Sequence, residues 1–443
     1  MGLLNQTPRV VLYALVLLCV VFLFTANWVY FSGVGNPFST VVEPVDDGQT
    51  HSLGVSSVFA FDAAQDTLRL TEAEQQRVAQ LQARVVSYNH NESNIVCPDR
   101  YIFVRLKRGV TRHHNQLQMM MNIIMWAERL NRTAVLGPFF VKNKWVIHSD
   151  LYNFSEIARH YCVVSIDTMR KRLSSRIPLT PVTIACFDGK ICRSAIMHFG
   201  FKVKIEIIES YTPDVPWNHV EAHFYLQQYF FKYPQNSKAE IVIIRSVAAF
   251  MMTRGLSDHA AIYGLLRPSA LIAQRVKRFL NHSFGPRGRF FAVHKRHLEM
   301  KCNNFLTESL PQLRTHFGVT LRSEREQLIR AQCNISIPYL AALHASLGLR
   351  LFSYPMFLAH DGQDPYTVPQ LKARGARVYE KEHYAQYEDC AYGLCALAVD
   401  YFVMTEAEYF SGNAVSTVSD NVCFVRLGRG KACHGMEPAI IRM

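Results

Sequence analysis

The sequence is short of acidic residues and lacks the patterns of several protein classes. It has 35 Asp and Glu against 48 Lys and Arg, a formal net charge of +13, and this excess indicates an anionic partner such as a phosphate-bearing ligand. No cysteine and histidine pair has zinc-finger spacing, and Cys390 and Cys395 are too far apart to indicate a metal site. With 49% hydrophobic and 19% charged residues, the composition excludes wholesale disorder and collagen-like repeats.

The 443 residues are enough for two or three domains, and they begin with an apolar segment. In residues 10–31 the only plainly polar interruptions are Thr25 and Asn27. As a helix this segment extends about 33 Å, which is enough to cross a bilayer. Its apolar core is longer than that of a cleaved signal peptide, and Phe24 stands where cleavage requires a small residue. The pattern therefore favours an uncleaved membrane anchor over a cleaved signal.

The charge before the anchor predicts its orientation. Arg9 is the sole charged residue there, so the positive-inside rule predicts a cytosolic tail at residues 1–9 and a type II topology. The rest of the chain keeps a net charge of +12, which is 13 minus 1 for Arg9. The basic part then lies across the membrane from the cytosol, which argues against a nucleic-acid partner.

Cysteines and glycosylation signals agree with this placement. Without Cys19, which lies in the anchor, ten of the 11 cysteines remain, and an even number is compatible with five disulfides of open connectivity. Asn-x-Ser/Thr sequons without a central proline begin at Asn91, Asn131, Asn153, Asn281 and Asn334. Disulfides and sequons together indicate the secretory pathway.

Residues 32–95 lack a long buried run, and we predict that they form a stem. Thr71 and Glu74 make a capping-box pattern at the start of a helix. The helix has a narrow apolar stripe formed by Val78, Leu81 and Val85. It either pairs with a second copy of itself or packs on its own domain.

From Tyr101 onward, predicted strands and helices alternate. The first half has strands at residues 101–104, 133–136, 202–208 and 241–244 and a helix at 116–130. After a turn-rich stretch at 281–288, the second half has strands at 289–293, 351–358, 377–379 and 409–410 and a helix at 393–404. The pattern predicts an α/β chain with two facing Rossmann-like domains, residues 96–284 and 285–443, whose ligands lie at the carboxyl ends of the strands.

The first loop with site character follows the strand at 101–104. Residues 107–116 are rich in cations between a strand end and a helix start, which is an arrangement that binds anions. Lys107 and Arg108 are better explained as a solvated turn. Arg112 and Asn115 lie on the last turn of the loop, from which their side chains can reach over the sheet edge.

The second loop directly follows the strand at 289–293. His294 and Arg296 point the same way in an extended chain, so both can contact one ligand. The planar guanidinium of Arg suits a phosphate, and Glu299 is well placed to hold it in one rotamer. The alternative is a buried Arg–Glu pair beside a core histidine.

The third loop comprises residues 410–417, where a strand turns through Gly412 into a helix that Asn413 is expected to cap. Free backbone N–H groups and the hydroxyls of Ser416 and Thr417 then face the sheet edge and form a phosphate cradle. Ordinary capping explains the same residues without a ligand. The three loops together nevertheless favour a shared anion site.

In order and spacing, these stretches resemble the GDP-fucose protein O-fucosyltransferase family and the wider superfamily of fucosyltransferases. The resemblance covers most of residues 97–430, the middle third only in outline. It is carried by Arg112-His-His-Asn-Gln116, Arg129-Leu-Asn-Arg-Thr-Ala-Val135, His294-Lys-Arg296, Ala359-His-Asp361, Asp400, Glu408-Tyr-Phe-Ser-Gly-Asn413 and Ser416-Thr417.

The resemblance implies a GT-B-type fold with GDP-fucose bound between the domains, inversion at the anomeric carbon, and no metal or further cofactor. It implies that Arg296 holds the β-phosphate and stabilises the leaving group, and that Arg112 and Asn115 lie near donor and acceptor. Residues 285–443 then bind the GDP-sugar and residues 96–284 face the acceptor. The further donor contacts are expected from His294, Glu299, Asp361, Asn413, Ser416 and Thr417. The chain also lacks the Asp-x-Asp triplet that metal-dependent glycosyltransferases commonly use.

Two positions depart from the family pattern. The first loop usually has glycine where this chain has His114, and the third usually has an aromatic residue where this chain has Val418. Because Asn115 can orient a hydroxyl but cannot accept its proton, one hypothesis is that His113 or His114 is the proton acceptor. The alternative is a surface histidine in a tolerant loop.

The resulting expectation is a single-pass enzyme of the endoplasmic reticulum or Golgi membrane that fucosylates Ser or Thr of a protein, for example in a folded cysteine-rich domain. A glycan acceptor, another GDP- or dTDP-deoxysugar donor, and an inactive relative that binds partners remain alternatives.

Overall fold

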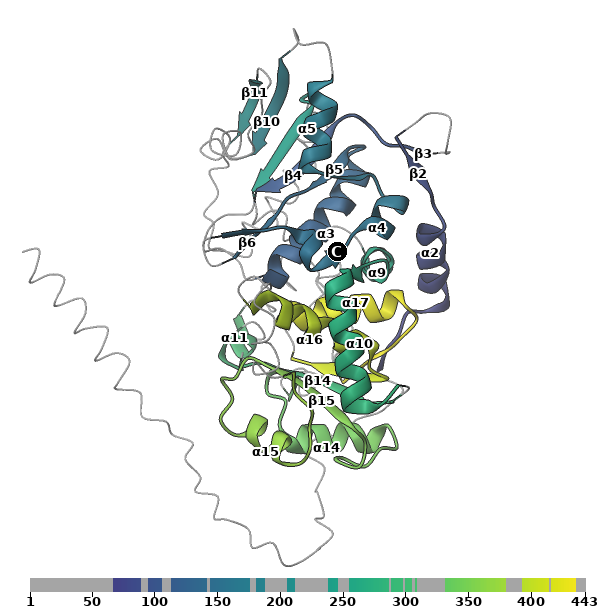
Figure 1. Cartoon of the computed structure of the whole chain (residues 1–443), viewed down its shortest axis with the longest axis vertical. Helices are drawn as coiled ribbons and strands as arrows, with labels where there is room; N and C mark the ends of the chain where they lie inside the picture. The colour runs from purple at the N-terminus through teal and green to yellow at the C-terminus, as the bar shows by residue number, and fades with distance from the viewer. Residues whose placement is uncertain are drawn as a thin grey trace, which may run out of the picture. The chain divides into compact units, whose positions relative to one another are not determined.

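The first half of the described chain forms a six-stranded parallel sheet in the order β11-β10-β12-β4-β5-β9 (Figure 1). Its strands are β4 (Tyr101–Arg105), β5 (Thr133–Leu136), β9 (Val163–Ser165), β10 (Val182–Phe187), β11 (Ile205–Tyr211) and β12 (Ile241–Arg245). The apolar run of β12 is buried between β10 and β4, as expected of a central parallel strand. The predictions for β4, β5 and β12 are confirmed, β11 begins a few residues late, and β9 and β10 were not predicted.

The structure is a computed structural model. It describes residues 67–88, 95–105, 113–141, 144–175, 181–187, 205–211, 238–245, 255–286, 288–297, 299–304, 307–308, 331–379, 393–413 and 416–435. All of them belong to one unit, Phe59–Met443. The predicted tail and anchor lie outside these residues, and within these residues no helix is long and apolar enough to cross a membrane.

Helix α3 (His113–Arg129) follows the first sheet strand and is buried almost all round. Because the sheet covers one side and helices α9 (Leu256–Gly264) and α17 (Thr417–Gly428) cover another, the helix has little exposed face. We predicted a helix from residue 116, but it begins at His113. Both histidines of the first loop are therefore helical residues. The same half contains α4 (Ser155–His160), α5 (Ile166–Ser174) and α10 (Ala270–Phe284).

The second half forms a smaller parallel sheet in which β14 lies between β15 and β16. The strands are β14 (Phe291–Lys295), β15 (Met356–His360) and β16 (Tyr409–Gly412), with helices α11 (Glu299–Asn304), α14 (Ile337–Ser346), α15 (Thr367–Ala373) and α16 (Leu394–Glu406). β15 starts later than predicted because Phe352 has a φ of 68°, which turns the chain before the strand. Of the strand expected at 377–379, a single bridge from Arg377 to Phe357 forms.

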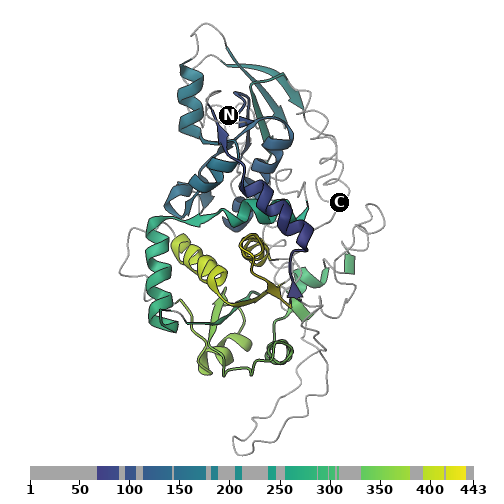
Figure 2. The same cartoon turned by 90° about the vertical axis from the view of Figure 1, so that its right-hand side faces the viewer.

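The two sheets share one hydrophobic core. Its buried residues include Ile102 and Leu136 from the first sheet, Phe357 and Phe410 from the second, and the inner faces of α3, α9, α16 and α17. In both views, the yellow helices α16 and α17 lie between the two groups of strands (Figures 1 and 2). Helix α10 also runs on to Phe284, so half of the predicted turn-rich stretch is helical. The halves are thus joined by packing as well as by the chain connection.

Helix α2 (Glu72–Gln82) packs on its own domain, which was one of the two predicted arrangements. Its capping box is confirmed, with Thr71 and Glu74 bonding each other's backbone N–H. Leu81 is buried, and Gln82 Nε2 donates to Ala261 O of α9 at 3.0 Å. Strand β1 (Thr67–Leu68) pairs antiparallel with β17 (Cys433–His434) at the end of the described chain. This part of the predicted stem therefore belongs to the same unit as the two sheets.

Disulfides reinforce both halves. The described pairs are Cys97–Cys162, Cys302–Cys333 and Cys423–Cys433. Cys186 and Cys395 are also disulfide-bonded. The expectation that the cysteines beyond the anchor form disulfides is confirmed for these eight.

Candidate active site

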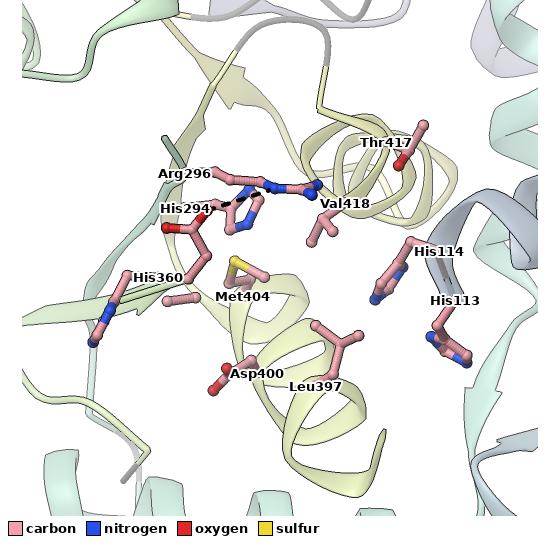
Figure 3. A pocket seen from close by; sticks show the side chains of 12 residues that line it. His113, His114, His294, Arg296, His360, Leu397, Asp400, Met404, Thr417 and Val418 are labelled. Atoms are coloured by element: carbon pink, nitrogen blue, oxygen red, sulfur yellow. Dashed lines mark ion pairs between the residues drawn. The ribbon is translucent and has the colours of Figure 1, made fainter. Parts of the chain in front are cut away.

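A cavity lies at the carboxyl ends of β14 and β15, where ligands of parallel α/β sheets are found (Figure 3). The second sheet contributes His294, Arg296 and Asp361, and three helices close the remaining sides. The helices are α3, α16 and the first turn of α17. The cavity therefore brings the first, second and third predicted loops together.

Arg296 is the one Lys or Arg among the described residues that line the cavity. Its Nε lies 3.8 Å from Asp361 Oδ2, and its side chain is 15% exposed. Asp361 is fixed in turn, because its carboxylate accepts from the backbone N–H groups of His297 at 3.3 Å and Gln363 at 3.2 Å. In Figure 3 the guanidinium of Arg296 extends towards Val418 at the start of α17. This geometry presents a positioned cation to the cavity.

Asn413 holds the backbone of Arg296. Its Oδ1 accepts from Arg296 N at 2.5 Å, and its Nδ2 donates to the carbonyl oxygens of Gln332 and Cys333 at 3.1 and 3.0 Å. Our prediction that Asn413 caps the next helix is wrong, because the N-cap of α17 is Ser416. The buried amide is used to join the ends of β14 and β16 instead.

His294 lies beside Arg296 as the strand alternation predicted. Its Nδ1 and Ser419 Oγ are 2.8 Å apart, which ties β14 to α17. Burial lowers the pKa of His294 to about 4. The imidazole is therefore neutral at neutral pH, and Arg296 supplies the positive charge.

The N-terminus of α17 faces the same cavity and has free hydrogen-bonding groups. Ser416 gives no side-chain cap, and its buried Oγ has no partner among the described residues. Thr417 lines the cavity, and its Oγ1 donates to Asn115 Oδ1 of α3 at 2.5 Å. A helix N-terminus with unused N–H groups and a nearby arginine is an anion site.

Helix α3 contributes His113 and His114 to the wall opposite the sheet. They are 3% and 2% exposed, and none of their four ring nitrogens has a partner among the described residues. Burial lowers the pKa of His113 to about 3, and burial with the neighbouring His113 and His294 lowers the pKa of His114 well below its usual value. Both imidazoles are neutral at physiological pH. The alternative that one of them is a surface histidine in a tolerant loop is therefore wrong, because both are buried.

Helix α16 provides a wall that our sequence reasoning did not assign to the site. Leu397, Asp400 and Met404 face the cavity from successive turns. Asp400 Oδ1 is buried without a partner in the described chain, and burial raises the pKa of this carboxyl well above its usual range. A neutral carboxyl can both donate and accept a hydrogen bond. The signal in the sequence was a lone acid within the apolar run of α16, since such residues are rarely buried without a reason.

Two predicted ligands cannot be placed. Arg112 and the side chain of Glu299 lie outside the described residues. The described parts of the chain contain no group of three or more His, Cys, Asp or Glu side chains that could hold a metal ion.

Comparison with solved structures places this architecture. The crystal structure of POFUT1 in complex with GDP-fucose matches with a TM-score of 0.50 and 19% identity, covering 76% of this chain and 97% of that one. The chain shares its fold with POFUT1. POFUT1 in complex with GDP matches equally, with a TM-score of 0.50, 19% identity and coverage of 76% and 97%. The expected mixed α/β fold is thereby confirmed, and it resembles that of POFUT1.

More distant matches include NodZ α-1,6-fucosyltransferase soaked with GDP-fucose, with a TM-score of 0.41 and 13% identity, covering 74% of this chain and 93% of that one. No protein-family model matches the sequence, and no curated protein matches it. The similarity to POFUT1 therefore lies in the fold, at an identity too low to assign an activity.

Proposed function

We propose that this chain is a glycosyltransferase that moves fucose from GDP-fucose to an acceptor hydroxyl, with inversion at the anomeric carbon. The observation that carries the proposal is the pairing of Arg296 with the open N-terminus of α17 at one cavity. The fold shared with POFUT1, which was crystallised with GDP-fucose, supports the same donor.

The chemistry of the donor fits these groups. When the bond between the sugar and the diphosphate breaks, negative charge develops on the β-phosphate. The guanidinium of Arg296 can donate two parallel hydrogen bonds to phosphate oxygens, and the α17 N–H groups with Ser416 Oγ can donate more. Such fixed donors often supply the largest catalytic contribution. We propose that they stabilise the leaving group without a metal ion.

The remaining predicted residues have supporting parts in the proposal. Asp361 forms an ion pair with Arg296, and Asn413 fixes the backbone of Arg296. His294 lies beside Arg296 and is bonded to Ser419. Asn115 accepts from Thr417, which leaves its Nδ2 to orient a donor or acceptor oxygen. Arg112 and Glu299 are proposed to complete the donor contacts.

We propose further that the acceptor is a Ser or Thr hydroxyl of a protein, approached from the α3 side, and that residues 10–31 anchor the enzyme in the endoplasmic reticulum or Golgi membrane. The disulfides support this compartment, because they persist where conditions are oxidising. Three alternatives differ from this proposal in a measurable way. The acceptor could be a glycan, the donor could carry a related deoxysugar, or the chain could bind its ligand without turnover.

Calorimetry on the full chain without its predicted anchor tests the donor. We expect GDP and GDP-fucose to bind in the presence of a metal chelator, and dTDP-sugars to bind more weakly. Arg296→Ala should weaken binding strongly, whereas Arg289→Ala should retain it, because Arg289 is largely exposed and pairs with Glu408. Equal binding by both variants, or no GDP-fucose binding by the wild-type chain, would contradict the proposal.

Turnover is tested separately by following GDP release with a folded cysteine-rich domain, a free glycan or no acceptor. Release that requires the protein domain supports protein fucosylation. Release that requires the glycan assigns the alternative acceptor, and tight binding with no release under any condition assigns a binding protein.

A further inference from the structure

The two histidines of α3 are neighbours in sequence but have different surroundings. The ring of His113 lies between Phe139, with centroids 4.5 Å apart, and Tyr152, at 5.6 Å and nearly parallel. Among the described residues, the ring of His114 has one close aromatic neighbour outside α3, Tyr401 at 4.9 Å. In Figure 3, His114 points into the hollow that Arg296 enters from the other side. Both histidines line the cavity, but the ring of His113 is packed between two aromatic rings, whereas that of His114 is not.

The backbone of His114 is held in place by a hydrogen-bond network that involves α17 and α9. Its carbonyl accepts from Asn421 Nδ2 at 3.1 Å, and Asn421 Oδ1 accepts from Tyr263 OH at 2.8 Å. All of these groups are buried. The backbone of His114 is thus fixed through Asn421, while both nitrogens of its imidazole lack a partner among the described residues.

Such an arrangement needs an explanation, because a buried polar group without a partner costs about 1–3 kcal/mol. A ligand that hydrogen-bonds to the ring would remove this cost. The ring is also neutral, since burial and the neighbouring His113 and His294 lower the pKa of His114. A neutral imidazole can accept a proton at one nitrogen.

We infer that His114 accepts the proton of the acceptor hydroxyl during transfer, an inference that rests on the proposed function. The hydroxyl oxygen forms a bond to the anomeric carbon while the bond from that carbon to the β-phosphate oxygen breaks. The electron pair of the broken bond leaves with GDP, and the hydroxyl proton moves to a ring nitrogen of His114. Atoms and charge balance without another reactant.

The charged surroundings decide how well this step works. The titratable groups around the cavity come from three sides: His113 on α3, Asp400 and Tyr401 on α16, and the ends of β14 and β15, which contribute His294, Arg296, His360 and Asp361. Without ligand, burial above all, and then the neighbouring His113 and His294, disfavour the imidazolium of His114. The diphosphate brings negative charge into the same cavity, so the imidazolium is stabilised when the leaving group departs.

Replacing each histidine by glutamine provides a matched test, because both are buried on the same helix. We expect His114→Gln to bind GDP-fucose normally, to lose about 100-fold or more in kcat for transfer, and to regain part of it with added imidazole. His113→Gln should show a smaller loss of kcat and no imidazole rescue. The acid limb of the kcat profile should be present in His113→Gln and absent from His114→Gln.

Two results would overturn the inference. One is full kcat in His114→Gln with the wild-type pH profile; the other is an equal loss in both variants without rescue, which indicates packing alone. If the wild-type chain did not bind GDP-fucose, the proposed function itself would be contradicted. Failure of the His114 inference and failure of the proposed function therefore give different results.

A second and independent inference concerns the sequon asparagines. Asn131, Asn153, Asn281 and Asn334 are all exposed. By contrast, three asparagines outside sequons are fully buried, namely Asn122, Asn413 and Asn421. The sequons are therefore found where a large glycan can be accommodated without unfolding the chain.

The side-chain atoms of these asparagines are also compatible with modification. Where the structure shows a hydrogen bond, the atom used is Oδ1, which accepts from Ser155 N in Asn153 and from Lys295 Nζ in Asn334. A glycan is attached to Nδ2. Modification therefore preserves both contacts.

We propose that these four asparagines carry N-linked glycans. The Nδ2 atom forms a bond to the anomeric carbon of an oligosaccharide supplied as a lipid diphosphate; the diphosphate leaves with the electron pair, and one amide proton is lost. The disulfides support passage through a compartment where this donor is present.

The test is secretory expression of the full chain followed by peptide N-glycosidase F digestion. We expect digestion to increase electrophoretic mobility, and each Asn→Gln substitution to remove one step of that shift. Ser283→Ala should remove the same step as Asn281→Gln, whereas Asn303→Gln, at an exposed asparagine outside any sequon, should change nothing. A chain with disulfides but no digestible glycan would overturn the proposal.

Discussion

The two walls of the cavity are built differently. On the wall from the second half, Arg296 forms an ion pair with Asp361 and a backbone hydrogen bond with Asn413, and His294 is bonded to Ser419 of α17. On the wall from α3, the buried imidazoles make aromatic contacts and their nitrogens lack partners among the described residues. One wall is electrostatically organised before a ligand arrives, and the other offers groups that a ligand has to satisfy.

This difference is informative about what each wall can bind. A fixed cation with oriented dipoles suits an invariant, highly charged group such as a diphosphate, because no reorganisation is needed during reaction. Neutral groups within an apolar wall suit an uncharged hydroxyl, whose hydrogen bonds are weaker. We therefore expect substitutions on the two walls to have different consequences.

The largest effect is expected at Arg296. Removing its guanidinium should lower turnover about 100- to 1,000-fold, the usual cost of one positioned donor to a developing negative charge. Arg296→Lys should recover part of the loss, since it keeps the charge but not the planar pair of donors. Steady-state kinetics with the exposed Arg289→Ala as control measures this. A lysine variant as poor as the alanine variant would show that geometry matters more than charge.

The next effect is expected at Asn413. Asn413→Ala leaves buried groups of Arg296, Gln332 and Cys333 without their partner, so the free energy of unfolding should fall by about 1–3 kcal/mol. Turnover per folded molecule should fall as well, because Arg296 loses its backbone anchor. Urea unfolding and kinetics on the same samples test this. Lower stability with unchanged turnover would show that Arg296 is positioned without Asn413.

Acid should destabilise both walls through their histidines. The pKa values of His294 and His113 are lowered to about 4 and about 3 by burial, whereas an unfolded histidine titrates near 6.5. Between these values the unfolded chain binds protons that the folded chain does not. Stability is therefore complete above about pH 6.5 and should fall by about 2 kcal/mol per histidine on going to pH 5.

Urea unfolding at pH 7 and pH 5 measures this acid sensitivity. His113→Phe keeps an aromatic ring between Phe139 and Tyr152 and removes one titrating group. Its pH dependence should be shallower than that of the wild-type chain. An unchanged slope would show that His113 contributes nothing to it.

The smallest effect is expected where the two walls meet. The hydrogen bond from Thr417 to Asn115 joins α17 to α3, and such a bond contributes about 1 kcal/mol. A double-mutant cycle with Asn115→Ala and Thr417→Val should give a coupling of about 0.5–1.5 kcal/mol in stability. Additive effects would show that the walls are independent.

Local pattern was sufficient for the central strands of the first sheet and for the relative direction of two site residues. The apolar runs of β4, β5 and β12 predicted central parallel strands, and alternation placed His294 and Arg296 on one side of the chain. The capping box of α2 followed from two residues. These features depend on neighbours a few residues apart, which the sequence records directly.

Contacts between distant segments were beyond such reasoning. Asn413 was expected to cap α17, but its amide bonds backbone groups about 80 and 117 positions away in sequence. Asp400 was recognised only within a motif, because its burial depends on how α16 lies across the cavity. The histidines of α3 gave no sign that Phe139, Tyr152 and Tyr401 would pack against their rings.

The sequence by itself determined an α/β chain, the three loops that meet at the site, and cysteines suited to disulfides. Only the tertiary structure decided that both halves share one core, that Asp361 pairs with Arg296, and that His114 lies buried opposite that arginine. Periodicity and spacing encode local conformation, whereas burial and pairing are created when segments far apart in the chain pack together, and these change the charge state and role of a side chain.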